Sequence, residues 1–599
     1  MNVPLKWLAE YVKLPKETKV LTDKLTDVGH MLDKVSKVDG ETIIDLELRG
    51  NRADMFGLIG VAREVAAVMN TNLKMPEVVS LPQIDANRPL VNVQPSAVGL
   101  VTRYTAVKLS VKVGPSPKWL ATRLKLYGLP SINNVVDITN YVMLETGEPL
   151  HAFDFHKIKG RQLILRRAKQ AEKFATITQG QTLNLSSEDL VICDQAGPQA
   201  LTMIGGLDSR VTDSTSEIIL EAAVYNQANC RRSARRLKVF TDSGTRHEKH
   251  LDPCQVALAL QRAIYLLQHH ATSKILGQTS DYYPHPVKSK IIKFDIAEVA
   301  RLTGLTVPPT AITKILTSLE FKASGNAVTV PTFRTDIEGP ADLVEEIGRI
   351  YGYAHIPATP IADPMPVPNS YPSYQLGEKL RDVCTNLGLD EVITLSLVEG
   401  GEVKLVNPPD PGFGYLRRDI SPSLIKYAQQ LLNLRQPQAT IFEVGKTFSK
   451  SGAKYLEHLR LGIAMGGKSL TISNLTGVLQ TAARLLGVDS LPAQAGAAGG
   501  IFWAEVDVDK LQHLLPAYAN PYSVVSTFPP IIEDVNVTYS GNYQQLVNRI
   551  KKISSLISQI ELVDKYADKL TLRITYHSTS KQLSSEDIAP IRKKLESIS

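Results

Sequence analysis

The chain has 599 residues, of which 43% are hydrophobic and 21% charged, a composition typical of folded globular domains. This length exceeds what one hydrophobic core supports and predicts about four domains. The formal net charge of +7 suits a polyanionic partner without requiring one. No window approaches the run of about 18 apolar residues that a membrane span needs, so no span is expected.

The N-terminus and the cysteines indicate the cellular compartment to expect. The first fifteen residues carry charges within their apolar stretch and lack the apolar core of a signal peptide. Cys193, Cys230, Cys254 and Cys384 are widely separated and form no CxxC pair, so neither a zinc site nor a disulfide framework is expected. We therefore expect a cytoplasmic protein.

Residues 1–75 predict an N-terminal unit of two amphipathic helices around a short strand. Leu5, Leu8 and Val12 fall on one face of the first helix, and residues 57–70 have the apolar spacing of the second. Prolines between 76 and 89 then mark a linker.

Two further domains are predicted before residue 360. Residues 90–285 predict a large mixed α/β domain, because short apolar runs alternate with turn residues. Residues 288–358 predict two short helices, a hairpin around Gly325 and Asn326, and a last helix from Asp342. This order resembles a winged helix.

A proline-rich stretch over residues 356–372 predicts a stiff connector to the C-terminal part. A domain of strands and helices is expected at 373–520, and a compact α+β unit at 521–599. The expected fold class of the whole chain is multidomain α+β.

The most informative stretch is NNVVDITNYVMLETGEPLHAFDFHKI, residues 133–158. It resembles the start of the editing domain of the bacterial-type phenylalanyl-tRNA synthetase beta subunit. The resemblance continues in the family's order over nearly the whole chain, through residues 204–223, 235–253, 329–357 and 405–425, the last followed by 441–448.

This resemblance implies the beta subunit of a phenylalanine–tRNA ligase. Residues 90–285 would be its editing domain, 373–520 an inactive module of class II synthetase type, and 521–599 a ferredoxin-like anticodon-binding domain. It also implies that ATP and phenylalanine bind on a separate alpha subunit, that the two subunits form an α2β2 heterotetramer, and that the complex binds tRNA(Phe). Two alternatives stay open: a non-editing scaffold of the same complex, and a DNA-binding winged-helix protein, which would explain only 288–358.

An editing site has a clear physical purpose. Tyrosine differs from phenylalanine by one hydroxyl group, which an apolar pocket rejects only weakly. By resemblance, His151, Glu221 and Thr241 fall in a site that hydrolyses the wrong ester: Glu221 would accept a hydrogen bond from the hydroxyl, and His151 would orient the ester or the attacking water. No Ser/His/Asp arrangement is visible, so water is the expected nucleophile. The structural alternative is a packed histidine and a salt-bridged Glu221.

The same region departs from the family's pattern. Lys238, His247 and His250 stand where the family usually has glycine, an aromatic residue and glycine, and Ser243 stands where a smaller residue is common. These changes leave the pocket's shape and activity open. Seven basic residues also lie within 231–249, a run that suits tRNA phosphates as well as it suits a solvated face.

Asp336, Asp342, Glu345 and Glu346 are the best metal candidates. The last three are spaced i, i+3 and i+4, so one helical face presents carboxylates that need a compensating cation, and hard oxygens suit magnesium. The resemblance also implies magnesium ligands at these four positions. The rival interpretation makes Asp342 a helix N-cap and Glu345 its capping-box partner.

The C-terminal region offers weaker candidates. Single-stranded bases are read by stacking on aromatic or arginine side chains, with lysines on phosphates. By residue type, Tyr522, Arg573 and Lys581 are candidates for tRNA binding. Arg417, Arg418 and Arg435 would suit a nucleotide site, but no glycine-rich phosphate loop occurs, so scaffold roles are favoured.

One part of the family pattern is missing. The family commonly carries an oligonucleotide-binding OB domain inserted in its N-terminal unit. Residues 35–57 leave no room for it. A short form is therefore expected, whose tRNA binding relies more on the other domains.

Overall fold

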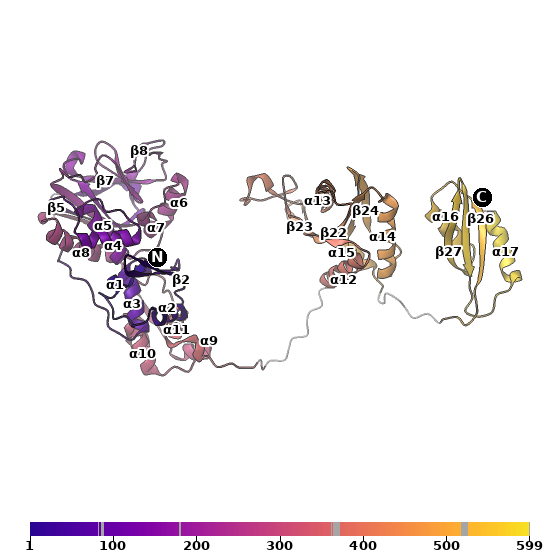
Figure 1. The fold of residues 1–599 in the computed structure, drawn as a ribbon, viewed down its shortest axis with the longest axis horizontal. Helices are drawn as coiled ribbons and strands as arrows, with labels where there is room; N and C mark the ends of the chain where they lie inside the picture. Colours follow the sequence, from indigo (N-terminus) through magenta and orange to yellow (C-terminus); the bar gives the residue numbers. More distant parts are fainter. Residues whose placement is uncertain are drawn as a thin grey trace. The chain divides into compact units, whose positions relative to one another are not determined.

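The computed structural model describes the chain except residues 82, 85–88, 179–180, 361, 363–371, 517–524 and 598–599. It separates into two compact units, Met1–Ala362 and Asp363–Ser599, which are described one at a time (Figure 1). Over the described ranges, no helix is long and apolar enough to cross a membrane.

A small antiparallel sheet and three helices form the N-terminal part of the first unit. The strands pair in the order β1-β3-β2. The helix predicted at residues 57–70 is confirmed as α3 and is buried along most of its length. The helix predicted through Val12 ends at Leu8, and α2 was not predicted. The elements are β1 (Asn2–Pro4), α1 (Leu5–Leu8), α2 (Thr18–Asp27), β2 (Leu32–Val38), β3 (Glu41–Leu46) and α3 (Leu58–Val68).

Strands β2 and β3 form a tight hairpin whose turn is Asp39-Gly40. Both turn residues have positive φ, 50° and 75°, the geometry that an Asp-Gly pair favours in a type I′ turn. The register pairs Val38 with Glu41 on either side of it. A two-residue turn thus joins β2 directly to β3, which leaves no room for an inserted OB domain between these strands, as the short form predicts.

Two sheets face each other across residues 91–282. One has four antiparallel strands in the order β14-β5-β13-β6, and the other has five in the order β12-β11-β10-β7-β4. Helices α5 and α8 cover the first sheet on its other face. The elements are β4 (Val91–Val93), β5 (Val101–Ser110), α4 (Lys118–Tyr127), α5 (Asn134–Thr146), β6 (Leu150–Asp154), β7 (Leu163–Arg167), β8 (Lys173–Ala175), β9 (Thr182–Asn184), β10 (Leu190–Cys193), β11 (Pro198–Leu201), β12 (Ile204–Gly205), β13 (Glu217–Tyr225), α6 (Gln227–Leu237), α7 (Asp242–His247), α8 (Gln255–His270) and β14 (Lys274–Tyr282).

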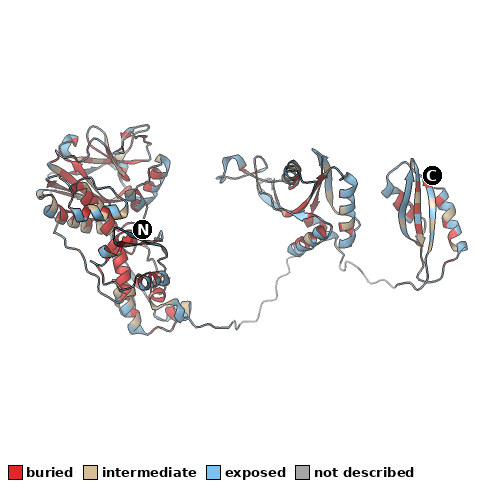
Figure 2. Cartoon of the chain, viewed as in Figure 1, coloured by how far each residue is buried: buried red, intermediate tan, exposed pale blue. Residues whose placement is uncertain are grey.

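Strand β13 is buried on both faces, and the side chains alternate between two cores. Ile218, Leu220, Ala222 and Val224 join the core under the helices. Ile219, Ala223 and Tyr225 join the core between the sheets. Buried residues concentrate in these sheets and in the helix faces packed on them (Figure 2). A side-chain period of two on a central strand explains why its sequence EIILEAAVY is almost continuously apolar. It also places Glu221 on the inter-sheet face.

Helix α5 has strong local signals at both ends. The Asn133 side chain caps it by accepting hydrogen bonds from the backbone N–H groups of Val135 (3.1 Å) and Val136 (2.9 Å). Gly147 ends it in the left-handed conformation with φ of 86°. The next residues form β6, so these caps fix the start of the strand that carries His151.

Residues 291–351 contain the predicted pair of helices and the hairpin. An additional strand, β15, precedes them and pairs with β17, giving a three-stranded sheet in the order β15-β17-β16. The last helix starts at Pro340, not at Asp342, because proline's fixed φ suits the first helical position. The elements are β15 (Ile291–Lys293), α9 (Ala297–Thr303), α10 (Pro309–Ser318), β16 (Lys322–Ser324), β17 (Ala327–Thr329) and α11 (Pro340–Tyr351).

The second unit begins with a five-stranded sheet in the order β18-β22-β23-β25-β24. Its strands are antiparallel except β18, which runs parallel to β22. A three-stranded sheet, β19-β21-β20, accompanies it. The elements are α12 (Pro372–Asn386), β18 (Asp390–Glu391), β19 (Leu397–Val398), β20 (Val403–Lys404), β21 (Tyr415–Leu416), α13 (Ser421–Asn433), β22 (Gln438–Ser451), β23 (Lys454–Gly467), α14 (Ile472–Leu486), β24 (Ala493–Ala498), β25 (Ile501–Asp507) and α15 (Val508–Leu514).

The C-terminal residues have the order β-α-β-β-α. Their antiparallel sheet runs β26-β28-β27 and has its own core with the two helices. The fourth strand of a ferredoxin-like sheet is not among the elements described over 525–597. The elements are β26 (Ile531–Thr538), α16 (Tyr543–Lys551), β27 (Ile557–Tyr566), β28 (Lys569–Tyr576) and α17 (Ser585–Glu596).

Candidate functional site

A cavity of about 570 Å³ lies in the first unit, beside the inter-sheet face of β13. Its walls come from α5, β6, β11, β12, β13 and α7. A volume of this size suits a small ligand or the aminoacyl end of a larger one. All three predicted editing residues, His151, Glu221 and Thr241, line it.

His151 and Glu221 are direct cross-strand neighbours. Strand β6 pairs antiparallel with β13, and the register sets His151 opposite Glu221. Residues opposite each other in an antiparallel pair project to the same face, with Cβ atoms about 4.5–5.5 Å apart. The two side chains, seventy positions apart in the sequence, are thus brought together at the cavity wall.

Glu221 is 7% exposed and holds no ion pair among the described residues. Its Oε2 has no hydrogen-bond partner among them. Burial raises the pKa of Glu221 to about 8, and the neighbouring Tyr104 hydroxyl opposes that rise. At neutral pH the side chain is therefore mainly an uncharged carboxylic acid, which can donate as well as accept a hydrogen bond. The alternative interpretation of Glu221 as a salt-bridged residue is therefore wrong for the described residues. Glu221 can also donate a hydrogen bond, whereas only an acceptor role was expected.

His151 is also uncharged. Burial lowers the pKa of the imidazole to about 4. The ring packs edge-on against Phe153, with centroids 4.5 Å apart, and its Nε2 has no partner among the described residues. Gly205 lies directly against the ring, because a Cβ added there would come within 2.5 Å of it. The close contact with Gly205 holds the imidazole ring of His151 in place, and Nε2 remains available to a ligand.

Thr241 has a structural role in the cavity wall. Its hydroxyl donates to the Met203 carbonyl oxygen (2.7 Å) and accepts from the Gly244 backbone N–H (2.9 Å), which makes it the N-cap of α7. The hydroxyl therefore already has one acceptor and one donor within the protein, the first of them 38 residues away in the chain. Thr241 therefore fastens the cavity wall around Met203 to the start of α7.

Of the four departures from the family pattern, two lie at the cavity and two do not. Lys238 is exposed and ends α6 in the left-handed conformation, φ 55°, which explains why glycine suits this position. His250 is exposed, and its carbonyl accepts a hydrogen bond from Thr335. Ser243 and His247, in contrast, line the cavity.

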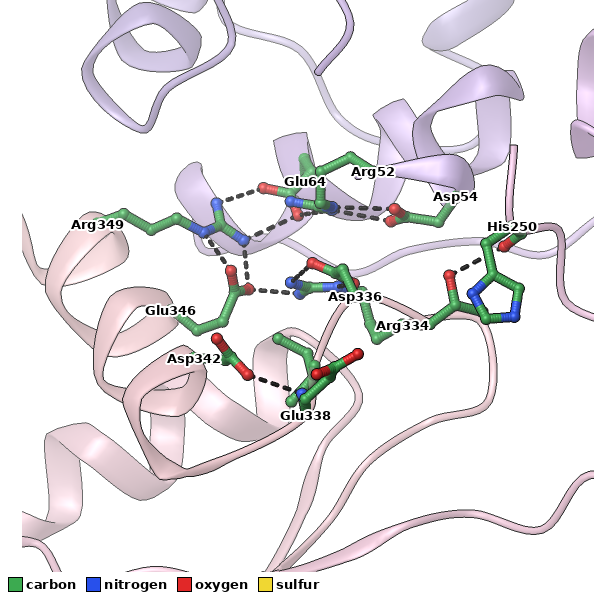
Figure 3. A network of polar contacts seen from close by, with 12 residues as sticks. Arg52, Asp54, Glu64, His250, Arg334, Asp336, Glu338, Asp342, Glu346 and Arg349 are labelled. Atoms are coloured by element: carbon green, nitrogen blue, oxygen red, sulfur yellow. Dashed lines mark hydrogen bonds and ion pairs between the residues drawn. The ribbon is translucent and has the colours of Figure 1, made fainter. Parts of the chain in front are cut away.

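The acidic cluster lies around a second cavity of about 320 Å³. Arginine side chains occupy two of its four carboxylates (Figure 3). Arg334 binds Asp336 through two hydrogen bonds of 2.9 and 2.8 Å and also binds Glu346. Arg349 binds Glu346 at 2.8 and 2.6 Å. Although burial opposes it, these bonds lower the pKa of Glu346 to about 2.

The same network extends into the N-terminal part of the first unit. Arg349 also binds Glu64 (2.6 and 3.0 Å), Glu64 binds Arg52 (2.6 Å), and Arg52 binds Asp54 through two bonds. These side chains are nearly all buried. Glu346 and Arg349 have the i, i+3 spacing of a helical ion pair, a signal in the sequence that the metal interpretation did not use.

The predicted magnesium ligands do not fit a metal ion as they lie. Asp342 sits at the third position of α11, and its carboxylate accepts from the backbone N–H groups of Glu338 (2.7 Å) and Gly339 (2.8 Å). The prediction of Asp342 as N-cap with Glu345 as its capping-box partner is wrong, because Gly339 is the N-cap and Asp342, at the third helical position, accepts a hydrogen bond from the backbone N–H of Gly339. Within the described part of the chain, no three His, Cys, Asp or Glu side chains are grouped as a metal site requires.

Removal of magnesium is expected to leave the stability of the first unit unchanged, because arginines already compensate the carboxylates. A site saturated a hundredfold above Kd would contribute about 2.7 kcal/mol. Denaturant unfolding of the full chain carrying Trp503→Phe tests this, since the remaining tryptophans, Trp7 and Trp119, both lie in the first unit. A free energy of unfolding that falls by that amount in excess EDTA would restore the metal interpretation.

The remaining candidates lie in the second unit. Arg417 is buried and binds Glu443 (2.7 Å), which agrees with the favoured scaffold role. Arg573 binds Asp534 through two exposed bonds of 2.9 Å, and Lys581 pairs with Asp587. Such exposed pairs are weak and leave both cations available. Tyr522 lies outside the described residues.

Comparison with known proteins identifies the modules. Residues 101–272 match the B3/4 domain model, 292–353 the tRNA synthetase B5 domain model, and 356–510 the phenylalanyl tRNA synthetase beta chain CLM domain model. Together they define a multidomain subunit of an aminoacyl-tRNA synthetase.

Curated relatives narrow the class to one enzyme. Phenylalanine–tRNA ligase beta subunits of Syntrophus aciditrophicus and Rhodopirellula baltica are 31% and 34% identical, over 93% and 75% of this chain and 79% and 68% of theirs. The Carboxydothermus hydrogenoformans protein of the same name is 29% identical over 95% of this chain and 81% of its own. The chain belongs to the phenylalanine–tRNA ligase beta subunits.

Proposed function

We propose that this subunit edits: the cavity at Glu221 and His151 hydrolyses Tyr-tRNA(Phe) and leaves Phe-tRNA(Phe) intact. The observation that supports it most is the cross-strand pairing of these two residues at a cavity of about 570 Å³. Their unpaired polar atoms, Glu221 Oε2 and His151 Nε2, match a substrate that brings a hydroxyl group and an ester.

In this mechanism Glu221 recognises the tyrosine hydroxyl. Uncharged at neutral pH, the acid can both accept from the phenol and donate to it. Phenylalanine would leave that buried group unpaired, which discriminates more strongly than an apolar wall can. Water then attacks the ester carbonyl carbon, and the bond to the ribose oxygen breaks, giving free tyrosine and a ribose hydroxyl. Neutral His151 orients the water or the ester through Nε2.

The partners follow from the same proposal. We propose that an alpha subunit holds ATP and phenylalanine, that two copies of each subunit form an α2β2 heterotetramer in the cytoplasm, and that tRNA(Phe) binds both. Residues 1–75 and 373–520 would meet the alpha subunit, and 521–599 would reach the anticodon through Arg573 and Lys581.

A test is co-expression with the alpha subunit, followed by deacylation of Tyr-tRNA(Phe) and Phe-tRNA(Phe). Selective loss of tyrosine from the tRNA is the expected result. A complex that charges tRNA with phenylalanine but leaves Tyr-tRNA(Phe) intact would favour the non-editing scaffold. The DNA-binding alternative accounts only for 288–358 and is set aside.

The exposed side of α6 is a proposed contact for tRNA phosphates. Arg231, Arg232 and Arg235 are exposed and form no ion pair with any described residue, whereas Arg236 pairs with Asp189. Replacing the first three with alanine should weaken tRNA binding and reduce the slope of log K against log salt by about 1 per lost phosphate contact.

Filter binding of tRNA(Phe) to the complex at several salt concentrations measures this slope. Arg301→Ala is the control, because Arg301 is also exposed on a helix but lies on α9, outside the basic run of α6. An unchanged slope in the triple variant would mean that the basic run is only a solvated face.

A further inference from the structure

His247 is a buried polar residue of the cavity that takes no part in the editing mechanism proposed above. It ends α7 and is 5% exposed. Its ring packs edge-on against Tyr225, with centroids 5.0 Å apart and planes at 67°. Tyr225 lies on β13 and lines the cavity together with Glu221 and Ala223. His247 is therefore built into the wall that carries the hydroxyl-reading acid.

The imidazole has an unused hydrogen-bonding atom. Its Nδ1 is buried and has no partner among the described residues, which is also true of Glu221 Oε2 and His151 Nε2. Buried polar atoms in native proteins are nearly always paired. Three exceptions around one cavity indicate a ligand that brings more than one polar group.

The charge states of His247 and Glu221 restrict which ligand groups can bind at this wall of the cavity. Burial, with a contribution from Arg246, lowers the pKa of His247 to about 3, so its ring is neutral. Glu221 is mainly uncharged as well. Two neutral groups suit a neutral donor and acceptor such as a phenolic hydroxyl, because a charged ligand group would be desolvated here without a counter-charge.

We propose that His247 is a specificity-determining residue, whose Nδ1 forms a second hydrogen bond, beside that of Glu221, to a hydroxyl on the aromatic ring of the aminoacyl ester. This inference rests on the proposed editing function and names its substrate class as hydroxylated aromatic side chains. The competing explanation is that the ring only fills space against Tyr225, which a phenylalanine would do equally well.

Two variants of the full alpha–beta complex separate these explanations. His247→Phe keeps the edge-on packing and removes the hydrogen bond. His247→Asn restores a polar nitrogen or oxygen near the position of Nδ1. Deacylation of Tyr-tRNA(Phe) and Phe-tRNA(Phe) is measured as kcat/KM, and charging with phenylalanine verifies that each complex is intact.

His247→Phe is expected to lower kcat/KM for Tyr-tRNA(Phe) about tenfold, the effect of one lost hydrogen bond. Phe-tRNA(Phe) should stay intact in this variant, and His247→Asn should recover most of the activity lost on Tyr-tRNA(Phe). His247→Gln, whose amide lies nearer the Nε2 position, should recover less.

Three outcomes would overturn the inference. If His247→Phe matches the wild type on both esters, the ring is only packing, and the editing function itself stands. If all variants lose deacylation of Tyr-tRNA(Phe) and charging with phenylalanine to the same extent, His247 has only a structural role. If the wild-type complex does not hydrolyse Tyr-tRNA(Phe) at all, the proposed function fails, and the role of His247 fails with it.

Discussion

Replacing Arg349 with methionine is expected to lower the free energy of unfolding of the first unit by about 3–5 kcal/mol. The change removes Arg349, the one side chain among the described residues that binds both Glu64 and Glu346. Those carboxylates are 1% and 4% exposed and would be left close together without their shared cation. Breaking a buried pair costs this much because the remaining charge stays desolvated.

The matched control is Arg301→Met. Arg301 pairs with Glu298 at the same i, i+3 spacing and a similar distance, but its side chain is 64% exposed. An exposed helical pair of this kind contributes about 0.3–0.5 kcal/mol. Both variants can be compared by denaturant unfolding in the Trp503→Phe background. Equal, small losses would show that the network adds no stability and reopen the question of what neutralises its carboxylates.

Replacing Glu221 with alanine is expected to lower kcat/KM for Tyr-tRNA(Phe) hydrolysis by about 10- to 100-fold, the range that corresponds to the roughly 1–3 kcal/mol of a buried hydrogen-bond partner. Glu221→Gln should keep most of the activity near neutral pH. Burial holds the pKa of Glu221 near 8, so the working form is the uncharged acid, which glutamine resembles in shape and in its ability to donate and accept.

Glu217→Ala is the control for this pair of variants. Glu217 lies on the same strand and pairs with Lys108 (2.9 Å), but it does not line the cavity. Its replacement should leave deacylation unchanged. Undiminished hydrolysis by Glu221→Ala would remove Glu221 from the mechanism. A glutamine variant as inactive as the alanine variant would mean that the ionised carboxylate is required.

Signals that are local in the chain predicted part of the secondary structure correctly. The apolar spacing of residues 57–70 predicts α3, because one helical face must be buried whatever covers it. The hairpin at Asp39-Gly40 was not predicted, although an Asp-Gly pair is itself a local signal for such a turn. Motif order indicates the family, which the curated relatives confirm.

Local reasoning was less reliable where two signals compete for one residue. Asp342 was expected at the N-cap, but Pro340 draws the start of α11 two residues earlier, and Asp342 caps the backbone from inside the helix. The strand β15 was missed because three residues give too short a pattern, and its pairing with β17 is a tertiary contact.

The chemistry of both sites was decided only in three dimensions. Which carboxylates meet which cations depends on packing: Glu64 reaches Arg349 across 285 positions, and this turns a predicted metal cluster into an arginine network. Burial, not residue type, makes Glu221, His151 and His247 neutral. The sequence by itself indicated the family and the candidate site residues. The tertiary structure decided the partners and the protonation states of those residues, because desolvation and long-range contacts exist only in the folded core.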